Sequence, residues 1–473
     1  MTEYNLIVDT DSYKTSHFLQ MPEDADAMFS YVESRGGKFS KTVMFGIRYI
    51  IEKYLTKKIT KKNIDRAEKI AKLQNMPFNR KGWEYIVEKH DGYIPVRIKS
   101  VREGTVVEAH NALVTIESTD PKVFWVVGYI EPLILRVWYP ITVASLSYDI
   151  KQNIIKKYVD KTSDFPESLV WKLHDFGARA CTSYESSCIG GAAHLINFAG
   201  SDTMAAINMI FDLYDIEDFM VGSVPASEHS TMTSWGRENE NEAYKNMLSV
   251  FASDDSEYKS PILACVSDAY DIIKALDNIW GTELKGQIQS SDTLVAIRPD
   301  SGSPLFMVMM TLQKLDEHFG HTVNTKGYKV LKNVRIVQGD GVDSVSIEEI
   351  LNYMELQGWS TDNIVFGMGG ALLQKINRDT NKFALKCSAI RRSGVWHDVY
   401  KDPITDKGKM SKKGIIDMFY DDATDRYVTL TGGRTAQDYF NKPSALNVFY
   451  ENGKTFFDET EDSFEMIRKR ASF

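Results

Sequence analysis

Polar side chains that could carry chemistry recur just after short apolar runs in the middle of the chain. Carboxylates, an imidazole and glycines at such positions can stabilise developing charge, bind a metal ion or approach a phosphate. An aspartate there can also merely cap the next helix, so the repetition of the pattern, more than any single residue, indicates a shared site. The residues concerned are Asp175, Asp202, His229, Asp268, Asp300, Asp340 and Gly370.

Two glycine-containing turns in this region have residue types suited to phosphate groups. In the string RPDSGSP, Pro299 restricts the turn, Asp300 can act as a ligand, and the glycine lets the backbone approach a phosphate closely. Gly369 and Gly370 open a predicted helix, whose bare N–H groups would form an anion site. The same GMGG string is just as often a tight turn, so this second signal is weak by itself.

The elements that must position these residues alternate between strand-like and helix-like patterns from about residue 166. Seven apolar runs end in polar turns, and amphipathic stretches such as LFMVMMTLQKLDEHFG follow several of them. This alternation predicts a parallel sheet with helical crossovers. The carboxyl ends of the strands of a (β/α) barrel share one rim, where active sites lie. We therefore expect an irregular (β/α) barrel over residues 166–385.

The flanking segments have a different pattern. Residues 1–165 combine helical spacing at 41–57, strand-like alternation at 93–116 and a buried helix pattern at 124–138, which predicts an N-terminal α+β domain. The tail, residues 386–473, contains the strand-like strings DRYVTLTGG and ALNVFYENGKTFF. We expect this tail to pack back on the N-terminal region. The predicted fold class is thus α/β, a barrel plus a discontinuous α+β domain.

Composition excludes several classes of protein. The 473 residues carry a net charge of −9, which argues against a general nucleic-acid binder. The four cysteines form no C-x-x-C pair, as expected for reduced thiols in a cytosolic protein. The N-terminus lacks the pattern of a signal peptide, and the longest apolar stretch, 123–135, is too short to span a bilayer. We expect a soluble, cytoplasmic protein.

Eight strings, in order along nearly the whole chain, resemble the nicotinamide phosphoribosyltransferase family. The resemblance implies the type II phosphoribosyltransferase fold and a homodimer whose active sites are shared between subunits. It also implies transfer of the phosphoribosyl group of phosphoribosyl pyrophosphate to nicotinamide in NAD salvage, with Mg²⁺ as cofactor and ATP as co-substrate. The strings are TDSYKTSH (10–17), KLHDFGARA (172–180), NFAGSDT (197–203), SVPASEHSTMTSWG (223–236), IRPDSGSP (297–304), VQGDGVD (337–343), FGMGGALLQK (366–375) and SKKG (411–414).

The resemblance assigns recognition of nicotinamide to four residues. Asp202 matches the aspartate that accepts a hydrogen bond from the amide NH₂ group, and it would repel the carboxylate of nicotinate. Phe176 and Tyr13 match the aromatic rings that sandwich the pyridine, the tyrosine coming from the other subunit. Arg179 matches an arginine near the ring and the pyrophosphate. Without the resemblance, Asp202 would be read as a helix cap and Phe176 as a core residue.

The resemblance also assigns the catalytic residues. His229 matches the histidine that ATP phosphorylates, and Glu228 precedes it. Asp271 matches the carboxylate that orients the imidazole and helps to hold Mg²⁺. Arg298 is placed by the substrate, and Asp300 at the ribose and the metal–pyrophosphate region, so the predicted metal ligands are Asp271 and Asp300.

The remaining predicted binding residues contact ribose or phosphate. Ala384 replaces a phosphate-site serine that close relatives carry two residues before Lys386, which puts one phosphate contact in doubt. By family analogy, Arg378 and Lys386 serve the neighbouring subunit's phosphate site, whereas SKKG alone would be read as a solvated loop. The full set comprises Asp11, Arg35, Ser267, Gly339, Asp340, Gly369, Gly370, Arg378, Lys386, Lys401 and Lys409.

Other functions stay open as alternatives. A nicotinate or other type II phosphoribosyltransferase would share the fold, and Asp202 argues against it. A non-catalytic binding or signalling protein on this scaffold would be expected to lack Asp202, His229 or Asp300. An aldolase-like barrel would need a Schiff-base lysine at a strand end. HDFG also resembles the magnesium motif of kinases, but the other kinase strings are missing.

Overall fold

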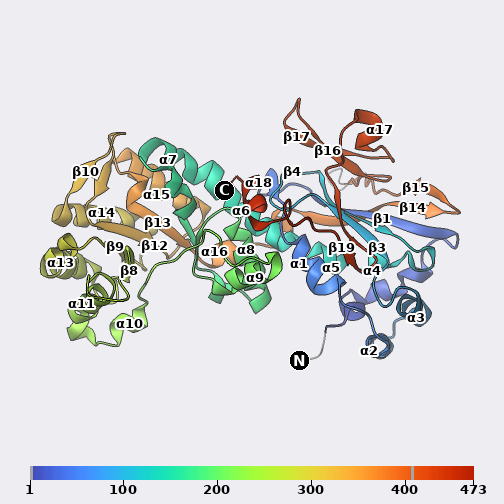
Figure 1. Ribbon diagram of the computed structural model, residues 1–473, viewed down its shortest axis with the longest axis horizontal. Helices are drawn as coiled ribbons and strands as arrows, with labels where there is room; N and C mark the ends of the chain where they lie inside the picture. The colour runs from blue at the N-terminus through green and yellow to red at the C-terminus, as the bar shows by residue number, and fades with distance from the viewer. Residues whose placement is uncertain (1–3, 406–409, 473) are drawn as a thin grey trace. The chain divides into compact units, whose positions relative to one another are not determined.

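The computed structural model describes residues 4–405 and 410–472, which divide into two compact units (Figure 1). One unit contains the residues up to Ser145 together with Asn377–Ser472, and the other is Leu146–Ile376. The two boundaries between the units, after Ser145 and after Ile376, lie earlier in the chain than the predicted boundaries at residues 165 and 385. The helical segment after Ser145 packs on α15 (Ser344–Leu356) of the second unit, and β14 (Phe383–Arg392) pairs within the first.

The first unit is built on a seven-stranded sheet in which C-terminal strands flank three central N-terminal strands on both sides. β14 pairs antiparallel with β1, and β18 pairs antiparallel with β3. These pairings confirm the predicted discontinuous α+β domain. The order is β15 (Val395–Asp398), β14, β1 (Ala25–Ser34), β5 (Ala112–Ser118), β3 (Val96–Ser100), β18 (Asn447–Glu451) and β19 (Lys454–Thr455).

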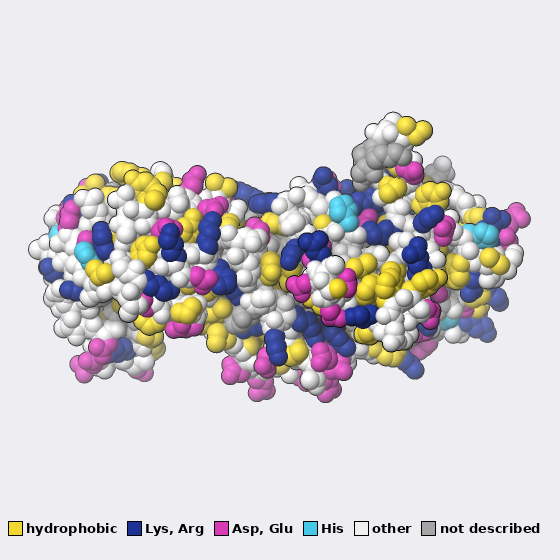
Figure 2. Space-filling view, turned by 90° about the horizontal axis from the view of Figure 1, so that it is seen from above, with side chains coloured by type: hydrophobic (Ala, Val, Ile, Leu, Met, Phe, Trp, Pro, Cys, Tyr) yellow, Lys and Arg dark blue, Asp and Glu magenta, His cyan; other side chains and the backbone are white. Residues whose placement is uncertain are grey.

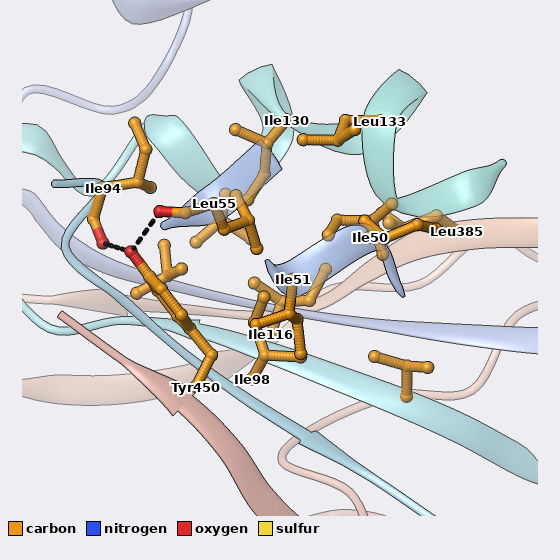
Figure 3. Packing of buried hydrophobic residues seen from close by; sticks show 14 of the residues in the cluster. Ile50, Ile51, Leu55, Ile94, Ile98, Ile116, Ile130, Leu133, Leu385 and Tyr450 are labelled. Carbon is orange, nitrogen blue, oxygen red and sulfur yellow. Dashed lines mark hydrogen bonds between the residues drawn. The ribbon is translucent and has the colours of Figure 1, made fainter. Parts of the chain in front are cut away.

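Helices cover one face of this sheet and form its main core with it (Figure 3). Ile98 and Ile116 from the sheet are fully buried with Ile51 from the helical layer, and each such side chain contributes roughly 1.5–3 kcal/mol to stability. The buried Tyr450 hydroxyl donates to the carbonyls of Ile94 at 3.1 Å and Leu55 at 3.4 Å. The helices of the first unit are α1 (Ile47–Ile50), continued as a π-helix over Ile51–Leu55, α2 (Lys61–Leu73), α3 (Arg80–Lys89), α4 (Val126–Tyr129), α5 (Glu131–Leu135), α6 (Trp138–Asp149), α17 (Ala436–Phe440) and α18 (Phe464–Arg470), of which α17 packs on β16.

Two expected helices of this unit differ from the structure. The helical pattern at 41–57 starts as a strand, β2 (Lys41–Val43), which pairs with β4 (Val106–Glu108), and becomes helical only at Ile47. The single helix expected at 124–138 is instead broken into α4, α5 and the start of α6. Pro132 lacks the N–H of an interior helical residue and occupies the first turn of α5, which explains the break.

The second unit is an irregular barrel of parallel strands. Six strands follow one another in the order β7 (Gly200–Ser201), β6 (Leu173–Asp175), β13 (Ile364–Met368), β12 (Val334–Gln338), β9 (Leu294–Arg298) and β8 (Ile262–Val266). The segment between Gly222 and Ala226 joins the two ends, through parallel bridges to Gly200 of β7 and Ala264 of β8. Six of the seven predicted runs are therefore regular strands. The seventh, DFMVGSVPASEHS, closes the ring without forming one.

The helices of the barrel alternate with its strands, as the sequence pattern predicts. Inside the ring, Ala264, Ala296 and Val337 form a small apolar cluster against Phe176 and Val224. A short hairpin, β10 (His321–Val323) and β11 (Lys329–Leu331), follows α14, and β16 (Asp417–Asp421) pairs with β17 (Arg426–Leu430) in the first unit. The barrel helices are α7 (Lys156–Thr162), α8 (Tyr184–Leu195), α9 (Met204–Tyr214), α10 (His229–Thr233), α11 (Glu240–Phe251), α12 (Ile272–Lys274), α13 (Lys285–Ser290), α14 (Pro304–Phe319), α15 and α16 (Gly370–Leu373).

Two further features concern the charge of the surface and the length of the helices. Basic and acidic side chains are intermixed on the face shown in Figure 2. Within residues 4–405 and 410–472, no helix is long and apolar enough to cross a membrane.

Candidate active site

The carboxyl ends of the barrel strands bring the predicted polar residues to one rim. Asp268, Asp300, Asp340 and Gly370 are each the second residue after a strand, following β8, β9, β12 and β13 respectively. Because parallel strands of a barrel end on the same side, the regular spacing places these residues on a common edge. The pattern recognised in the sequence therefore corresponds to a real feature of the fold.

An imidazole and two carboxylates form a hydrogen-bonded network on this rim. His229, the first residue of α10, lies with Nε2 3.0 Å from Asp268 Oδ1 and Nδ1 3.8 Å from Asp300 Oδ2. The other oxygen of Asp268 accepts hydrogen bonds from the Asp300 backbone N–H at 3.0 Å and from the Ser301 hydroxyl. The Asp268 side chain is 4% exposed and that of His229 is 45% exposed, so a fixed carboxylate holds an accessible imidazole.

Asp271, predicted to orient this imidazole, does not do so in the structure. Its carboxylate accepts the Lys274 N–H at 3.1 Å and caps α12, while Asp268 contacts His229. The assignment of the orienting role to Asp271 was therefore wrong, because two aspartates lie close together in SDAYD. Asp268 had the better signal, since it has the same two-residue distance from its strand as Asp300.

The aromatic residue predicted to stack on the pyridine lies over a glycine of the barrel. A Cβ atom at Gly367 would lie 1.9 Å from the Phe176 ring, so only glycine allows the ring to occupy this position. A Cβ at Gly339 would lie 3.4 Å from the same ring, 3.6 Å from Asp300 Oδ1 and 3.7 Å from Arg298 Cδ. The side chains of Phe176, Arg298 and Asp300 therefore converge beside Gly339. Arg298 and Asp300 form an ion pair of 3.3 Å.

Asp202 follows β7 on the strand next to β6, which ends just before Phe176. Its backbone N–H donates to the Asp175 carbonyl at 3.0 Å, and its exposed carboxylate accepts the Ser223 hydroxyl. Ser223 belongs to the irregular closing segment and was not predicted as a site residue. Its hydroxyl contact fixes the orientation of the Asp202 carboxylate.

Asp175 supports both of these positions from inside the protein. Its Oδ1 accepts the Gly177 N–H at 2.7 Å, and its carbonyl accepts the Asp202 N–H. Its Oδ2 is buried with no hydrogen-bond partner among the described residues, and burial raises the pKa of this carboxyl to about 6. Gly191 leaves the space that this oxygen occupies, since a Cβ there would lie 2.9 Å away.

The other predicted residues of the barrel unit have varied surroundings. Ser267 is fully buried, where its hydroxyl donates to the Cys265 carbonyl and accepts the Trp280 indole N–H, so it is a structural residue and not part of an open site. Glu228 caps α10 and accepts the Ser230 hydroxyl. Gly339, Asp340 and Gly369 lie on loops that follow barrel strands, Arg179 lies in a 3₁₀ helix after β6, and Gly370 begins α16; Arg179 and Asp340 are exposed.

The predicted phosphate-binding cations belong to the first unit. Burial is the largest cause that lowers the pKa of Lys386; the nearby Glu131 opposes it, and Arg35, Lys401 and Arg378 lower the pKa further. Tyr13 is 57% exposed, and Asp11 precedes the same 3₁₀ helix, Ser12–Leu19. Lys409 lies outside the described residues. The phosphate-binding roles of Arg35, Arg378, Lys386 and Lys401 stay predictions.

A separate cavity of about 480 Å³ lies in the first unit and includes none of the predicted site residues. Arg102, Lys442 and Arg470 contribute to its walls, and each pairs with an acid, respectively Asp462, Asp422 and Glu461. Its positive charges are therefore already neutralised by the protein.

Comparison with known proteins agrees with this geometry. The pattern of the nicotinate phosphoribosyltransferase (NAPRTase) family matches residues 171–444, and that of the nicotinamide phosphoribosyltransferase N-terminal domain matches residues 5–98. A nicotinamide phosphoribosyltransferase of Xanthomonas campestris pv. campestris is 49% identical over 99% of this chain and 98% of its own length. One from Mycoplasma pneumoniae is 31% identical over 88% of this chain and 96% of its own.

This chain belongs to the nicotinamide phosphoribosyltransferase family.

Solved structures place this family member in its fold class. A nicotinate-nucleotide pyrophosphorylase from Pyrococcus furiosus aligns with a TM-score of 0.61 at 14% identity, over 100% of this chain and 96% of that one. Human nicotinic acid phosphoribosyltransferase aligns with a TM-score of 0.52 at 12% identity, over 98% and 92%. At these identities the likeness concerns the fold alone. It confirms the predicted type II phosphoribosyltransferase architecture of barrel plus α+β domain.

Proposed function

We propose that this enzyme transfers the phosphoribosyl group of phosphoribosyl pyrophosphate to nicotinamide, yielding nicotinamide mononucleotide and pyrophosphate for NAD salvage. Asp202 is the observation that carries the choice of substrate. Its accessible carboxylate, held by Ser223 beside the strand that ends before Phe176, can accept a hydrogen bond from an amide NH₂ group. A nicotinate carboxylate would meet like charge there and lose that bond.

The chemistry requires mainly positioning and charge stabilisation. The pyridine nitrogen of nicotinamide attacks the anomeric carbon as pyrophosphate leaves, and no proton has to be removed from it. Phe176 offers a flat face for the ring. The carboxylate of Asp300, near Phe176 and Arg298, would stabilise the positive charge that develops on the ribose. Held in one geometry, the two reactants meet without the entropic cost of a free encounter.

His229 is proposed to accept the γ-phosphoryl group of ATP. The Asp268 carboxylate would accept a hydrogen bond from the Nε2–H of the neutral imidazole, which leaves the lone pair on Nδ1 as the nucleophile. The bond from Nδ1 to the γ-phosphorus would form as the bond to the ADP oxygen breaks. Hydrolysis of the phosphohistidine would then favour product formation.

Mg²⁺ is proposed to accompany the pyrophosphate. Within residues 4–405 and 410–472, no group of three or more His, Cys, Asp or Glu side chains could hold a metal ion alone. Mg²⁺ commonly uses one or two carboxylates together with substrate phosphates, so this donor set fits an ion that arrives with the substrate. Asp300 and Asp271, the ligands predicted from the resemblance, would supply the protein oxygens, and the ion would neutralise charge on the leaving group.

We also propose a homodimer with shared active sites, in which the partner subunit's Tyr13, Arg378 and Lys386 complete each barrel site. This part of the proposal rests on the resemblance to the family. Mixing an inactive His229→Ala subunit with an inactive Lys386→Ala subunit tests it, because shared sites would restore activity in the mixed dimer. Two inactive homodimers that gain no activity on mixing would contradict it.

The reaction itself is tested by mass detection of nicotinamide mononucleotide from nicotinamide, phosphoribosyl pyrophosphate and Mg²⁺, with and without ATP. The expected result is product with nicotinamide, more product with ATP, and little or no nicotinate mononucleotide when nicotinate replaces nicotinamide. Preferential use of nicotinate would instead make the enzyme a nicotinate phosphoribosyltransferase. No product from either base would reject phosphoribosyl transfer to both.

A further inference from the structure

A buried glutamate on the central sheet of the first unit lies among the cations proposed to bind phosphate. Tyr31, Glu33 and Arg35 lie at alternate positions along and just beyond β1, so their side chains share one face of the sheet. On the neighbouring strand, Lys386 pairs directly with Tyr31, and Ala384 with Glu33. Glu33 therefore lies directly between residues assigned to anion binding.

The Glu33 carboxylate holds two cations at once. Its side chain is 3% exposed, its Oε1 accepts Arg35 Nε at 2.9 Å, and its Oε2 accepts the Lys412 ammonium. The Tyr31 hydroxyl donates to Oε1 at 3.3 Å and accepts the Lys412 backbone N–H at 2.9 Å. Burial raises the pKa of Tyr31 to about 12, which keeps the phenol protonated as a donor. Lys412 of SKKG is thus a fixed residue and not a solvated one.

Fixing Lys412 also fixes the backbone of Lys401. The Lys401 N–H donates to the Ser411 hydroxyl, and the Ser411 N–H donates to the Lys401 carbonyl, both at 2.9 Å. The two ends of this connection, at Val399 and Gly414, both donate to the Ser388 carbonyl of β14. The pair of Glu33 and Lys412 therefore anchors the base of the segment that carries Lys401.

Arg35 retains donors for a ligand after this pairing. Its Nη2 is buried and has no hydrogen-bond partner among the described residues, although Nε is bound by Glu33. Burial lowers the pKa of the neighbouring Lys386, Glu131 opposes this, and repulsion from Arg35, Lys401 and Arg378 adds to the lowering. The unpaired Nη2 donor of Arg35 beside these cations suits a phosphate ester.

We infer that Glu33 is a positioning residue for phosphate binding: it orients the free edge of Arg35 and, through Lys412, fixes Lys401. The inference rests on the proposed function, and the ligand class is the phosphate ester of the substrate. Glu33 itself carries negative charge and would not touch the phosphate. If Glu33 had only a structural role, its contacts would stabilise the fold without affecting phosphate affinity. The test must therefore measure ligand affinity and thermal stability separately.

The experiment compares the full-length wild type with Glu33→Gln, Lys412→Met and the double variant. The double variant leaves no unpaired charge between the two positions, so its thermal midpoint should recover towards the wild-type value. Its KM for phosphoribosyl pyrophosphate and its Kd for ribose 5-phosphate, measured by calorimetry, should nevertheless rise about tenfold, while the KM for nicotinamide stays within about twofold. Glu33→Asp, which keeps the charge at shorter reach, should give an intermediate rise.

Asp462→Asn is the matched control. Asp462 is also a buried carboxylate of the first unit, 6% exposed, and pairs with Arg102 at 2.6 Å. This variant should lower the thermal midpoint without changing ribose 5-phosphate affinity. A double Glu33/Lys412 variant that is as stable as the wild type and binds ribose 5-phosphate with wild-type affinity would overturn the inference. Ribose 5-phosphate binding requires no turnover, so a wild type that forms no nicotinamide mononucleotide would reject the proposed function and leave this test intact.

Discussion

The predicted site residues of the two units differ in charge. The barrel rim carries Asp268 and Asp300 next to His229, with Asp202 after β7, whereas the first unit carries Arg35, Lys386 and Lys401. Each region also contains a buried carboxylate. Glu33 in the cationic region contacts two cations, while Asp175 in the barrel has an oxygen with no hydrogen-bond partner among the described residues.

Phosphoribosyl transfer needs stabilisation of both a positive and a negative charge. A ribose that becomes cationic is stabilised by carboxylates, and phosphate groups are stabilised by arginine and lysine. Each unit also contains ion pairs of its own, Arg298 with Asp300 in the barrel and Glu33 with Arg35 in the first unit. In the proposed function, the barrel carboxylates serve the ribose and the cations of the first unit serve the phosphate groups.

Removing the imidazole should give the largest effect and tests whether the acidic region drives the ATP-linked chemistry. His229→Ala is expected to abolish ATP hydrolysis and to lower the ATP-stimulated synthesis rate by roughly 100- to 1000-fold, because the proposed phosphoryl acceptor is removed. Coupled assays of ADP and nicotinamide mononucleotide measure both. Full ATP-coupled turnover in this variant would refute the role of His229.

Replacing Asp202 should alter selectivity more than rate. In Asp202→Ser the acceptor for the nicotinamide NH₂ group and the charge that repels nicotinate are both lost, so the preference for nicotinamide should fall by roughly 100-fold. The ratio of kcat/KM for the two bases measures this. Ser223→Ala, which removes only the hydroxyl that orients the carboxylate, should give a smaller change in the same direction. An unchanged ratio in Asp202→Ser would remove Asp202 from base recognition.

Much of the barrel could be predicted because its signals are local. An apolar run followed by a polar turn identifies the ends of strands such as β9 and β12, and Asp300 and Asp340 lie where that rule expects them. The closing segment could not be assigned in the same way. Its hydrogen bonds come from Gly222 and Ser227 and from neighbouring strands, and Pro225 cannot donate to a ladder. Pro132 could have predicted the break between α4 and α5, but the helical spacing of the apolar residues around it favoured a single helix.

The site was predictable in its residue types but less so in its contacts. Asp268 and Asp271 differ only in distance from the end of β8, and their roles separate when Asp271 becomes the cap of α12. Ser267 was misassigned because its side chain turns inward to Trp280. The pair of Glu33 and Lys412 joins residues 379 positions apart, so only the folded sheet brings them together.

The corrected partner of His229 gives a comparison between two nearby aspartates. Asp268→Asn keeps the size of the side chain but can present an NH₂ group to Nε2, which would favour the wrong imidazole tautomer. The rate of histidine phosphorylation should fall by about 10- to 100-fold. Rapid-quench detection of the phosphoenzyme measures this rate. Asp271→Asn should have a smaller effect, and a larger loss in Asp271→Asn would restore the original assignment.

The unpaired buried carboxylate of Asp175 should have the smallest effect on the reaction and a clear effect on stability. Its folded pKa of about 6 lies above the ordinary value of 3.8, so the folded state binds more protons than the unfolded state between these two values. The contribution to stability is thus present at pH 4 and is lost as the pH rises through 6. The loss is at most about 3 kcal/mol. Asp175→Asn, which keeps the Gly177 contact, should therefore be more stable than the wild type at pH 7.

Thermal midpoints of Asp175→Asn, Glu33→Gln and the wild type, measured at pH 4.5 and pH 7, compare the two buried carboxylates. In Asp175→Asn the advantage over the wild type should grow between the two pH values, because the variant has no carboxylate to ionise. Glu33→Gln should be less stable than the wild type at pH 7, since it leaves the Lys412 ammonium buried without its counter-charge. Equal destabilisation of both variants at pH 7 would mean that Asp175 has a compensating partner, and the contrast between the two buried carboxylates would be lost.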